Sequence, residues 1–255
     1  MEIKGKKAIV LGGASGMGRA SAEQLAARGA DVIVLDRPQS AGAEVAAGFG
    51  GTFLPVDVVD FEGTGAVLAQ AVEQLGGLHI TVTTAGGGGA ERTFGKKGPH
   101  SLEHFRRTLD LNTVATFNIS RLAAAHMAAN DPEDEETPER GVIINTASIA
   151  AFEGQIGQVA YTASKAAIAG MTLTMARDLG SLGIRVLSIA PSLFLTGATN
   201  EVPDEMAAAL VKDAAFPKRM GKPEEYGKLA VAIIENPMLN GQCIRLDAGQ
   251  RFGPR

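Results

Sequence analysis

The sequence predicts a single α/β domain in which helices cover both faces of a parallel sheet of about seven strands. Short apolar segments alternate along the chain with longer helical patterns. Most of the short segments are apolar throughout, as is typical of strands that are buried on both faces. This strand–helix–strand alternation predicts a doubly wound sheet with the strand order 3-2-1-4-5-6-7.

Seven strands and seven helices are expected in turn. The strands are expected at residues 7–11, 31–35, 52–55, 79–83, 142–146, 185–190 and 243–246. The helices are expected at 16–28, 40–48, 61–75, 102–130, 158–181, 203–212 and 223–235. Right-handed crossovers bring the carboxyl ends of the strands to one edge of the sheet, where ligands bind. Residues 131–140 are polar and contain proline, so we expect a solvated loop there, with a partner-binding segment as the alternative.

The composition is that of an ordinary globular protein. Hydrophobic residues make up 45% of the 255 residues and charged residues 20%, and residues 1–255 are expected to form one domain. The net charge of −4 argues against a general affinity for nucleic acid. Cys243 is the only cysteine, which excludes an internal disulfide and favours a reducing compartment. Because the sequence has no long apolar run and opens on a short charged segment, we expect a cytoplasmic protein without a membrane span or leader peptide.

A glycine-rich turn joins the first expected strand to the first helix. Gly12 lets the chain turn sharply, Gly16 lets the backbone approach a pyrophosphate, and Gly18 lets the helix pack closely on the strand. The helix presents free N–H groups and the positive end of its dipole to a phosphate. This placement predicts a Rossmann-like dinucleotide site, with Ser15 and Met17 as further contacts in the same turn.

Further cofactor contacts are expected where other strands end. Asp36 ends the second strand, where its carboxylate accepts hydrogen bonds from ribose hydroxyls and repels a 2′-phosphate, which favours NAD over NADP. Two alternatives stay open: Asp36 is a turn residue before Pro38, or Arg37 softens the preference by meeting a phosphate. The third strand end supplies two contacts beside the adenine and the fourth supplies two small residues: Asp57, Val58, Ala85 and Gly86.

Ser148, Tyr161 and Lys165 are expected to support hydride transfer at an alcohol carbon. Ser148 follows a strand, and Tyr161 and Lys165 are i and i+4 on one face of a helix. A tyrosine that acts as a base at neutral pH needs its pKa lowered by about 3 units, or roughly 4 kcal/mol. A lysine ammonium one turn away and a positive nicotinamide ring supply this, while Ser148 holds the substrate oxygen. The alternative is that Tyr161 only packs, as we expect for Tyr226.

Asn112 and the histidines carry weaker patterns. Asn112 lies inside an expected helix, where asparagine is unfavourable, so it either packs there or marks a kink that holds a water linking Lys165 to solvent. His100 and His104 are i and i+4, but the sequence offers no third ligand near them. We therefore expect surface histidines and no metal site.

Together these motifs resemble the short-chain dehydrogenase/reductase family across the whole chain. The glycine turn, Ala85-Gly86 and the four polar residues fall in the family's order and spacing. The resemblance implies a catalytic tetrad of Asn112, Ser148, Tyr161 and Lys165. It also implies that Thr196, after Pro191, grips the nicotinamide carboxamide. Three positions depart from the family's usual residues and would alter cofactor geometry: Leu11, Thr83 and Ser192.

Other segments resemble a branch of the family that acts on 3-hydroxyacyl-CoA thioesters: 35–38, 96–98, 116–118, 141–157, 170–173 and 236–247. This resemblance implies NAD(H), a homotetramer and Gln155 in the substrate pocket. It places Lys96 and Lys97 near CoA phosphates, unless their loop is simply solvated. Residues 196–221 are expected to form a substrate lid, because they join a strand to the last helix and contain prolines.

Other functions remain open on the sequence. The same chemistry would serve a 3-oxoacyl-carrier-protein reductase, a hydroxysteroid dehydrogenase or a sugar-alcohol dehydrogenase. From a different class, the chain would be a nucleotide-binding regulator without turnover.

Overall fold

A parallel sheet of seven strands, in the order β3-β2-β1-β4-β7-β8-β9, forms the centre of the computed structural model, which describes residues 1–96, 98–132, 136, 138–197 and 203–254. The strands are β1 Lys7–Leu11, β2 Asp31–Asp36, β3 Thr52–Pro55, β4 Ile80–Thr83, β7 Gly141–Thr146, β8 Ile184–Pro191 and β9 Cys243–Leu246. Counted within the sheet alone, this order is 3-2-1-4-5-6-7. The predicted doubly wound topology is confirmed.

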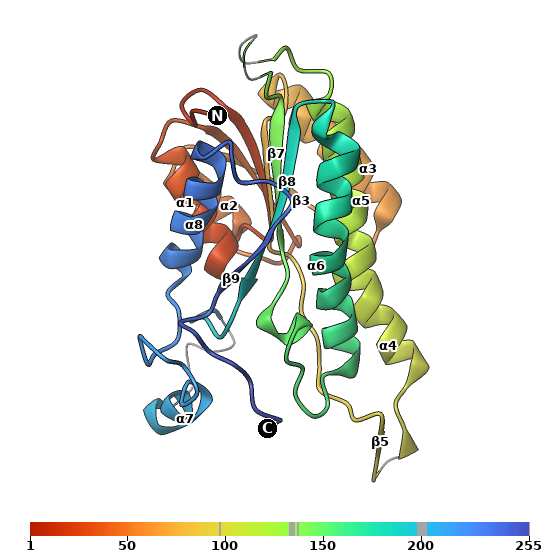
Figure 1. Cartoon of the computed structure of the whole chain (residues 1–255). Helices are drawn as coiled ribbons and strands as arrows, with labels where there is room; N and C mark the ends of the chain where they lie inside the picture. The colour runs from red at the N-terminus through yellow and green to blue at the C-terminus, as the bar shows by residue number, and fades with distance from the viewer. Residues whose placement is uncertain (97, 133–135, 137, 198–202, 255) are drawn as a thin grey trace.

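Helices cover both faces of the sheet (Figure 1). On one face lie α1 Gly16–Ala26, α2 Gly42–Gly48 and α8 Pro223–Glu235. On the other side lie α3 Phe61–Leu75, α4 Leu102–Leu109, α5 Ala115–Met127 and α6 Val159–Gly180. The short α7 (Asp204–Leu210) lies beyond one end of the sheet, where the side chain of Gln250 donates a hydrogen bond to the carbonyl oxygen of Leu210 at 2.9 Å.

The central strands are apolar throughout because both of their faces are covered. Every residue of β4, β7 and β8 is buried. Since successive side chains of a strand point to opposite faces, Val10 belongs to the hydrophobic cluster beneath α1 and α8, whereas Ile9 and Leu11 belong to the cluster beneath α3 and α5. Leu11, which departs from the family's usual residue, is therefore a fully buried packing residue.

Three parts of the fold differ from the prediction. The helix expected at 102–130 is divided into α4, a π-helical turn Asp110–Val114 and α5. The expected loop around Lys96 contains a small antiparallel hairpin, β5 Phe94–Gly95 and β6 Gly98–Pro99. A 3₁₀ turn, Ile149–Ala151, also follows β7. The remaining differences are a few residues at element ends, where frayed backbone hydrogen bonds make boundaries indefinite.

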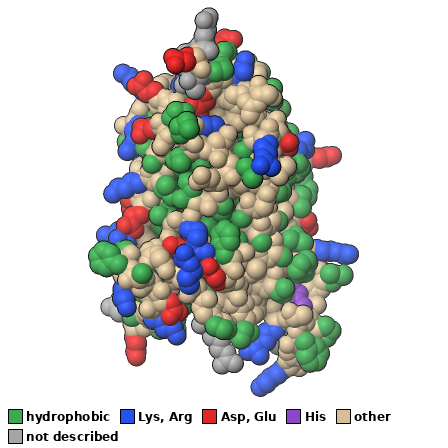
Figure 2. Space-filling model, in the orientation of Figure 1, with side chains coloured by type: hydrophobic (Ala, Val, Ile, Leu, Met, Phe, Trp, Pro, Cys, Tyr) green, Lys and Arg blue, Asp and Glu red, His purple; other side chains and the backbone are tan. Residues whose placement is uncertain are grey.

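Side chains of both charges are mixed with apolar ones over the face shown in Figure 2, in keeping with the small net charge of −4. Within the described ranges, no helix combines the length and the apolar character needed to cross a membrane. Lys97, residues 133–135 and 137 of the expected loop, and residues 198–202 of the expected lid lie outside the described residues.

Candidate active site

The turn between β1 and α1 is packed too tightly for side chains. Gly12 has φ +77°, and a Cβ there would lie 2.6 Å from the amide nitrogen of Ala85. A Cβ on Gly18 would lie 2.2 Å from the carbonyl oxygen of Gly12. Thr84, which the sequence analysis did not single out, directs its hydroxyl to the carbonyl oxygens of Leu11 and Gly12 at 3.1 and 3.2 Å. The turn is thus held against the end of β4, and at Gly12 and Gly18 only backbone fits.

A cleft of about 300 Å³ lies beside this turn at the carboxyl ends of β1 to β4. Asp36 lines it, and its carboxylate accepts hydrogen bonds from the amides of Ala14 (3.0 Å) and Arg37 (2.7 Å). Each carboxylate oxygen keeps a further lone pair for a ligand hydroxyl. The full lining is Gly12, Ser15, Asp36, Arg37, Val56, Asp57, Val58, Thr84, Ala85, Gly86 and Leu111. The structure therefore brings together the residues expected around an adenosine.

The other expected cofactor residues lie around the turn. Gly16, with φ +50°, faces Thr196, whose Cγ2 would lie 2.9 Å from a Cβ on that glycine. Pro191 is buried at the end of β8. Met17 is partly buried and packs against the hydrophobic cluster beneath α1. Ser15, the N-cap of α1, forms no side-chain capping bond within the described chain, which leaves the first N–H groups of this helix to a ligand.

Ser148, Tyr161 and Lys165 meet beyond the end of β7. Lys165, on α6, is 3% exposed; its Nζ donates to the carbonyl oxygen of Thr146 at 2.8 Å and lies 5.8 Å from the centre of the Tyr161 ring. Burial lowers the pKa of Lys165 from 10.5 to about 8. Burial also raises the pKa of Tyr161, and a hydrogen bond with Ser148 opposes that rise. The phenol therefore stays protonated unless nearby positive charge stabilises its anion.

The π-helical turn aims Asn112 at the loop that follows β4. The side chain is fully buried, and its Nδ2 donates to the carbonyl oxygens of Gly87 (2.7 Å) and Thr108 (2.9 Å). Its Oδ1 accepts from the amide of Gly87 at 3.0 Å. Because a Cβ on Gly86 would lie 2.6 Å from that oxygen, Asn112 fixes the backbone of this loop beside Lys165.

Tyr226 is buried in the core, as predicted, and is also hydrogen-bonded. Its hydroxyl lies 2.7 Å from Oγ1 of Thr146, which in turn donates to the carbonyl oxygen of Thr83 at 2.6 Å. Burial strongly raises the pKa of Tyr226. The contact fixes Thr146, whose carbonyl oxygen holds Lys165.

A second cavity, of about 430 Å³, opens in front of Ser148 and Tyr161. Its far wall contains apolar side chains of α7 and of the C-terminal segment, among them Met206, Leu210 and Phe252. Gln155 also lines it, and its Nε2 donates to the carbonyl oxygen of Gly253 at 3.3 Å. Ser192, another departure from the family's usual residues, lies in the same wall.

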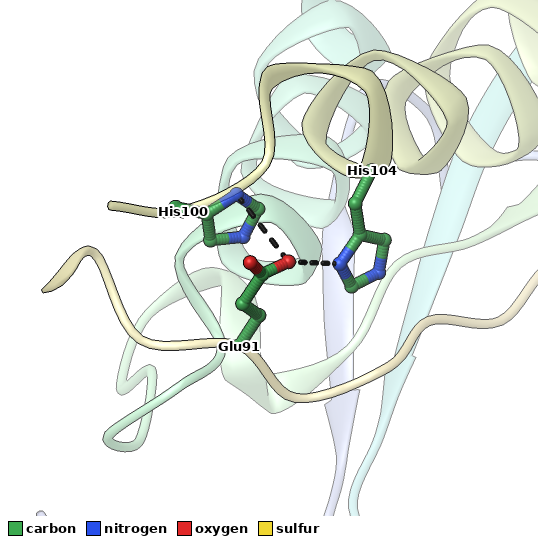
Figure 3. A group of neighbouring side chains, drawn as sticks. All are labelled: Glu91, His100 and His104. Carbon is green, nitrogen blue, oxygen red and sulfur yellow. Dashed lines mark hydrogen bonds and ion pairs between the residues drawn. The ribbon is translucent and has the colours of Figure 1, made fainter. Parts of the chain in front are cut away.

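Glu91 joins His100 and His104 into a cluster at the start of α4 (Figure 3). Oε2 of Glu91 lies 2.6 Å from Nδ1 of His104 and 3.7 Å from Nδ1 of His100. The hydrogen bond with His104 lowers the pKa of the Glu91 carboxyl. The expectation that these histidines lack a third ligand nearby is therefore wrong. Glu91 is separated from both histidines in sequence by the β5–β6 hairpin, so the sequence alone did not indicate that they are in contact.

The chain is similar to known proteins over nearly its whole length. A sequence profile of the family described as short chain dehydrogenase matches residues 6–207. The chain is 50% identical to the 3-hydroxyacyl-CoA dehydrogenase type-2 of Drosophila melanogaster, over 99% of this chain and 100% of that one. Its identity to the Homo sapiens protein of the same name is 47%, over 99% of this chain and 97% of that one.

Solved structures are also similar. The crystal structure of 3-hydroxyacyl-CoA dehydrogenase type-2 from Mycobacterium avium matches with a TM-score of 0.94 and 40% identity, over 98% of both chains. A 7α-hydroxysteroid dehydrogenase complexed with NADH and 7-oxo glycochenodeoxycholic acid has a TM-score of 0.86 and 29% identity, over 98% and 95%. This chain therefore belongs to the short-chain dehydrogenase family.

Proposed function

We propose that this chain is an NAD(H)-dependent dehydrogenase that interconverts the 3-hydroxy and 3-keto groups of acyl-CoA thioesters, with Tyr161 as its acid/base. The three expected catalytic side chains lie where the cleft and the second cavity can both be reached. Lys165 borders the cleft, since its Nζ would lie 3.2 Å from a Cβ on Gly86, while Tyr161 and Ser148 line the adjoining cavity. The relatives named 3-hydroxyacyl-CoA dehydrogenase type-2, which match the full length at 45–50% identity, support the choice of substrate.

The cleft suits a dinucleotide. Gly12 and Gly18 leave only backbone beside it, and the uncapped start of α1 offers N–H groups to a pyrophosphate. Asp36 binds the ribose hydroxyls, which favours NAD(H), and Asp57 and Val58 adjoin the adenine. The glycine turn adds Ser15, Gly16 and Met17 near the pyrophosphate, the end of β4 adds the small residues Ala85 and Gly86, and Thr196, after Pro191, binds the nicotinamide carboxamide. These residues would hold NAD(H), which would supply the hydride acceptor or donor for the substrate carbon.

The chain's own residues handle the proton. Ser148 donates to the substrate oxygen and holds it beside Tyr161. In oxidation the phenolate oxygen of Tyr161 takes the proton of the 3-hydroxyl, and in reduction the phenol returns it. The Lys165 ammonium stabilises the phenolate, an interaction strengthened by the low dielectric of the buried site. Asn112 positions the Gly87 backbone and thereby the wall next to Lys165.

The second cavity fits the acyl chain. Met206 and Leu210 of α7 contribute apolar wall, and Gln155 lies at its edge. We infer that residues 196–221 act as a lid, because side chains of α7 line the cavity. Lys96 is exposed on the β5–β6 hairpin, and its ammonium would bind a CoA phosphate, with a plain solvated loop as the alternative. A hydroxysteroid is the second candidate substrate, favoured by the apolar wall and by the similarity to the 7α-hydroxysteroid dehydrogenase.

A substrate panel tests the reaction. The purified chain is mixed with NADH and either acetoacetyl-CoA, an acetoacetyl-carrier-protein thioester or a ketosteroid, and NADH absorbance is followed. We expect acetoacetyl-CoA to be the best substrate, and Tyr161→Phe to lose roughly 10²–10⁴-fold in kcat while still quenching NADH fluorescence on binding. Full turnover by Tyr161→Phe would exclude the assigned acid/base. Binding of NADH without turnover of any carbonyl substrate would favour a regulator.

A homotetramer is the proposed assembly. Large apolar side chains are exposed on the helical segments after Asn112 and Tyr161, including Val114 of the π-helical turn, Phe117 of α5 and Leu173 of α6. Apolar exposure of this kind is typical of surfaces that bury each other. Light scattering during gel filtration should give four times the 26.3 kDa chain mass, and a monomer would contradict the assembly. We also expect a reducing compartment, because the sequence has a single cysteine.

A further inference from the structure

Three side chains with metal-binding atoms converge at the start of α4. Glu91 comes from the segment after β4, His100 from the end of the β5–β6 hairpin, and His104 from the first turn of α4 (Figure 3). One ligand atom from each lies within 4.8 Å of the other two. Ligands bound to one ion through bonds of about 2.0–2.2 Å lie roughly 3.2–3.6 Å apart in a tetrahedron. The rings of His100 and His104 are stacked with their centres 5.3 Å apart, so they turn toward a common centre when an ion binds.

His100 provides an independent sign of a ligand. Its side chain is only 10% exposed, and its Nε2 is buried without a hydrogen-bond partner among the described residues. Its Nδ1 lies 2.8 Å from the carbonyl oxygen of Ser101. A buried ring nitrogen without a partner is costly, so a group that bonds to it would stabilise the fold.

The cluster is also accessible to an ion. The side chains of Glu91 and His104 are 34% and 33% exposed, so their ligand atoms lie near the surface and leave space for a water ligand. Two imidazoles and one carboxylate form a ligand set that zinc and similar transition metals favour, and the histidines exclude the harder Ca²⁺ and Mg²⁺.

We propose that Glu91, His100 and His104 bind a divalent transition-metal ion, for which Zn²⁺ is the best match, with water completing the coordination. Oε2 of Glu91 supplies the carboxylate bond. His104 ligates through Nδ1, and the proton that Nδ1 shares with Glu91 moves to Nε2 of the same ring. His100 ligates through Nε2, the ring nitrogen without a partner among the described residues, while its Nδ1–H keeps the hydrogen bond to the carbonyl oxygen of Ser101. No electron is transferred, and the ion's oxidation state does not change.

The position of the cluster gives the ion a structural role beside the active site. Glu91 is already tied to the loop that carries Gln155, because its amide donates to the carbonyl oxygen of Gly157 at 2.8 Å. A Cβ on Gly89 would lie 3.4 Å from the His104 ring, and one on the neighbouring Gly88 would lie 2.9 Å from the Tyr161 ring. The ion therefore braces the segment that separates it from Tyr161 and takes no part in proton or hydride transfer.

Metal titration of the full chain tests this site. Protein treated with a chelator and then desalted is titrated with Zn²⁺ by calorimetry. We expect one ion per chain and, at a free Zn²⁺ concentration about 100 times Kd, a Tm raised by roughly 5–10 °C. Co²⁺ in place of Zn²⁺ should give the visible absorption bands of a low-symmetry nitrogen–oxygen site.

Single-ligand variants identify the residues. Glu91→Gln, His100→Asn and His104→Asn should each weaken Zn²⁺ binding by at least about tenfold, the smallest loss that supporting residues of metal sites cause. His126→Asn, a histidine on α5 outside the cluster, is the matched control and should bind as the wild type does. The proposal is overturned if wild-type protein binds no stoichiometric Zn²⁺, or if the three variants bind it as tightly as the control. Circular dichroism of the metal-free variants separates loss of a ligand from loss of fold.

Discussion

At the scale of single residues, the buried lysine of the active site is held at a cost to stability. The pKa of Lys165 is lowered from 10.5 to about 8, so between these pH values the unfolded chain holds a proton that the folded chain has lost. The free energy of unfolding of the wild type therefore rises with pH across this window, by up to about 3 kcal/mol from this group.

Lys165→Met lacks this dependence. Relative to Lys165→Met, the free energy of unfolding of the wild type should therefore increase by about 3 kcal/mol between pH 7 and pH 10.5. Urea unfolding at several pH values measures the difference, in which the other titrating groups cancel. A stability difference that stays constant with pH would show that folding does not lower the pKa of Lys165.

Asp36 is the residue on which cofactor choice depends. Its carboxylate lines the cleft with both oxygens already oriented by backbone amides. Asp36→Ala removes the charged acceptor of the ribose hydroxyls and the repulsion of a 2′-phosphate, so the preference for NADH over NADPH should fall at least tenfold. Fluorescence titration with both cofactors measures it. Asp57→Ala is the control: it should weaken both cofactors alike, because the adenine is common to them.

At the scale of elements, the π-helical turn matters because it aims one side chain. Asn112→Ala breaks its bonds to Gly87 and Thr108 and leaves the Gly87 amide and carbonyl unpaired, at a cost of roughly 1–3 kcal/mol. The freed loop adjoins Lys165 and the cleft, so KM for NADH should rise and kcat should fall.

Asn118 offers the comparison for that variant. It lies on α5, is also buried, and donates to the carbonyl oxygen of Phe61 at 3.1 Å, away from the cleft. Asn118→Ala should lose comparable stability in thermal unfolding and keep its kinetic constants. If both variants keep their kinetic constants, Asn112 has only a structural role.

These local elements also mark what the sequence could predict. Tyr161 and Lys165 were predictable because helical spacing alone puts them on one face, and Ser148 because it closely follows a strand. A kink at Asn112 was one of the two alternatives, but its π-helical form was not predictable, since the bonds that favour it come from Gly87, far from Asn112 in sequence. The roles of Glu91 and Thr84 were not predictable for the same reason, because each contacts a partner that only folding brings near.

At the scale of the whole molecule, the order of the sheet was predictable because apolar strands and right-handed crossovers leave few topologies. Polar contacts that join distant elements were not. Arg185, on β8, is 6% exposed, pairs with Glu139 at 2.7 Å and donates to the carbonyl oxygens of Ile233 and Ile234 at the end of α8. The carboxylate of Glu139 also accepts a hydrogen bond from the amino group of Met1 at 2.9 Å.

This buried charge cluster couples the sheet to α8, and it gives the last prediction. Arg185→Met leaves Glu139 buried with one cation fewer, and it places an apolar side chain against carbonyl oxygens at the end of α8 that then lack a donor. The free energy of unfolding in urea should therefore fall by about 3–5 kcal/mol. Arg19→Met, which breaks an exposed pair with Glu23 on α1, should leave the urea midpoint nearly unchanged. Because Arg185 lies at the end of β8 away from Pro191, the folded variant should keep its KM for NADH. A stability loss no larger than that of Arg19→Met would mean that water or backbone shifts satisfy the cluster without its arginine.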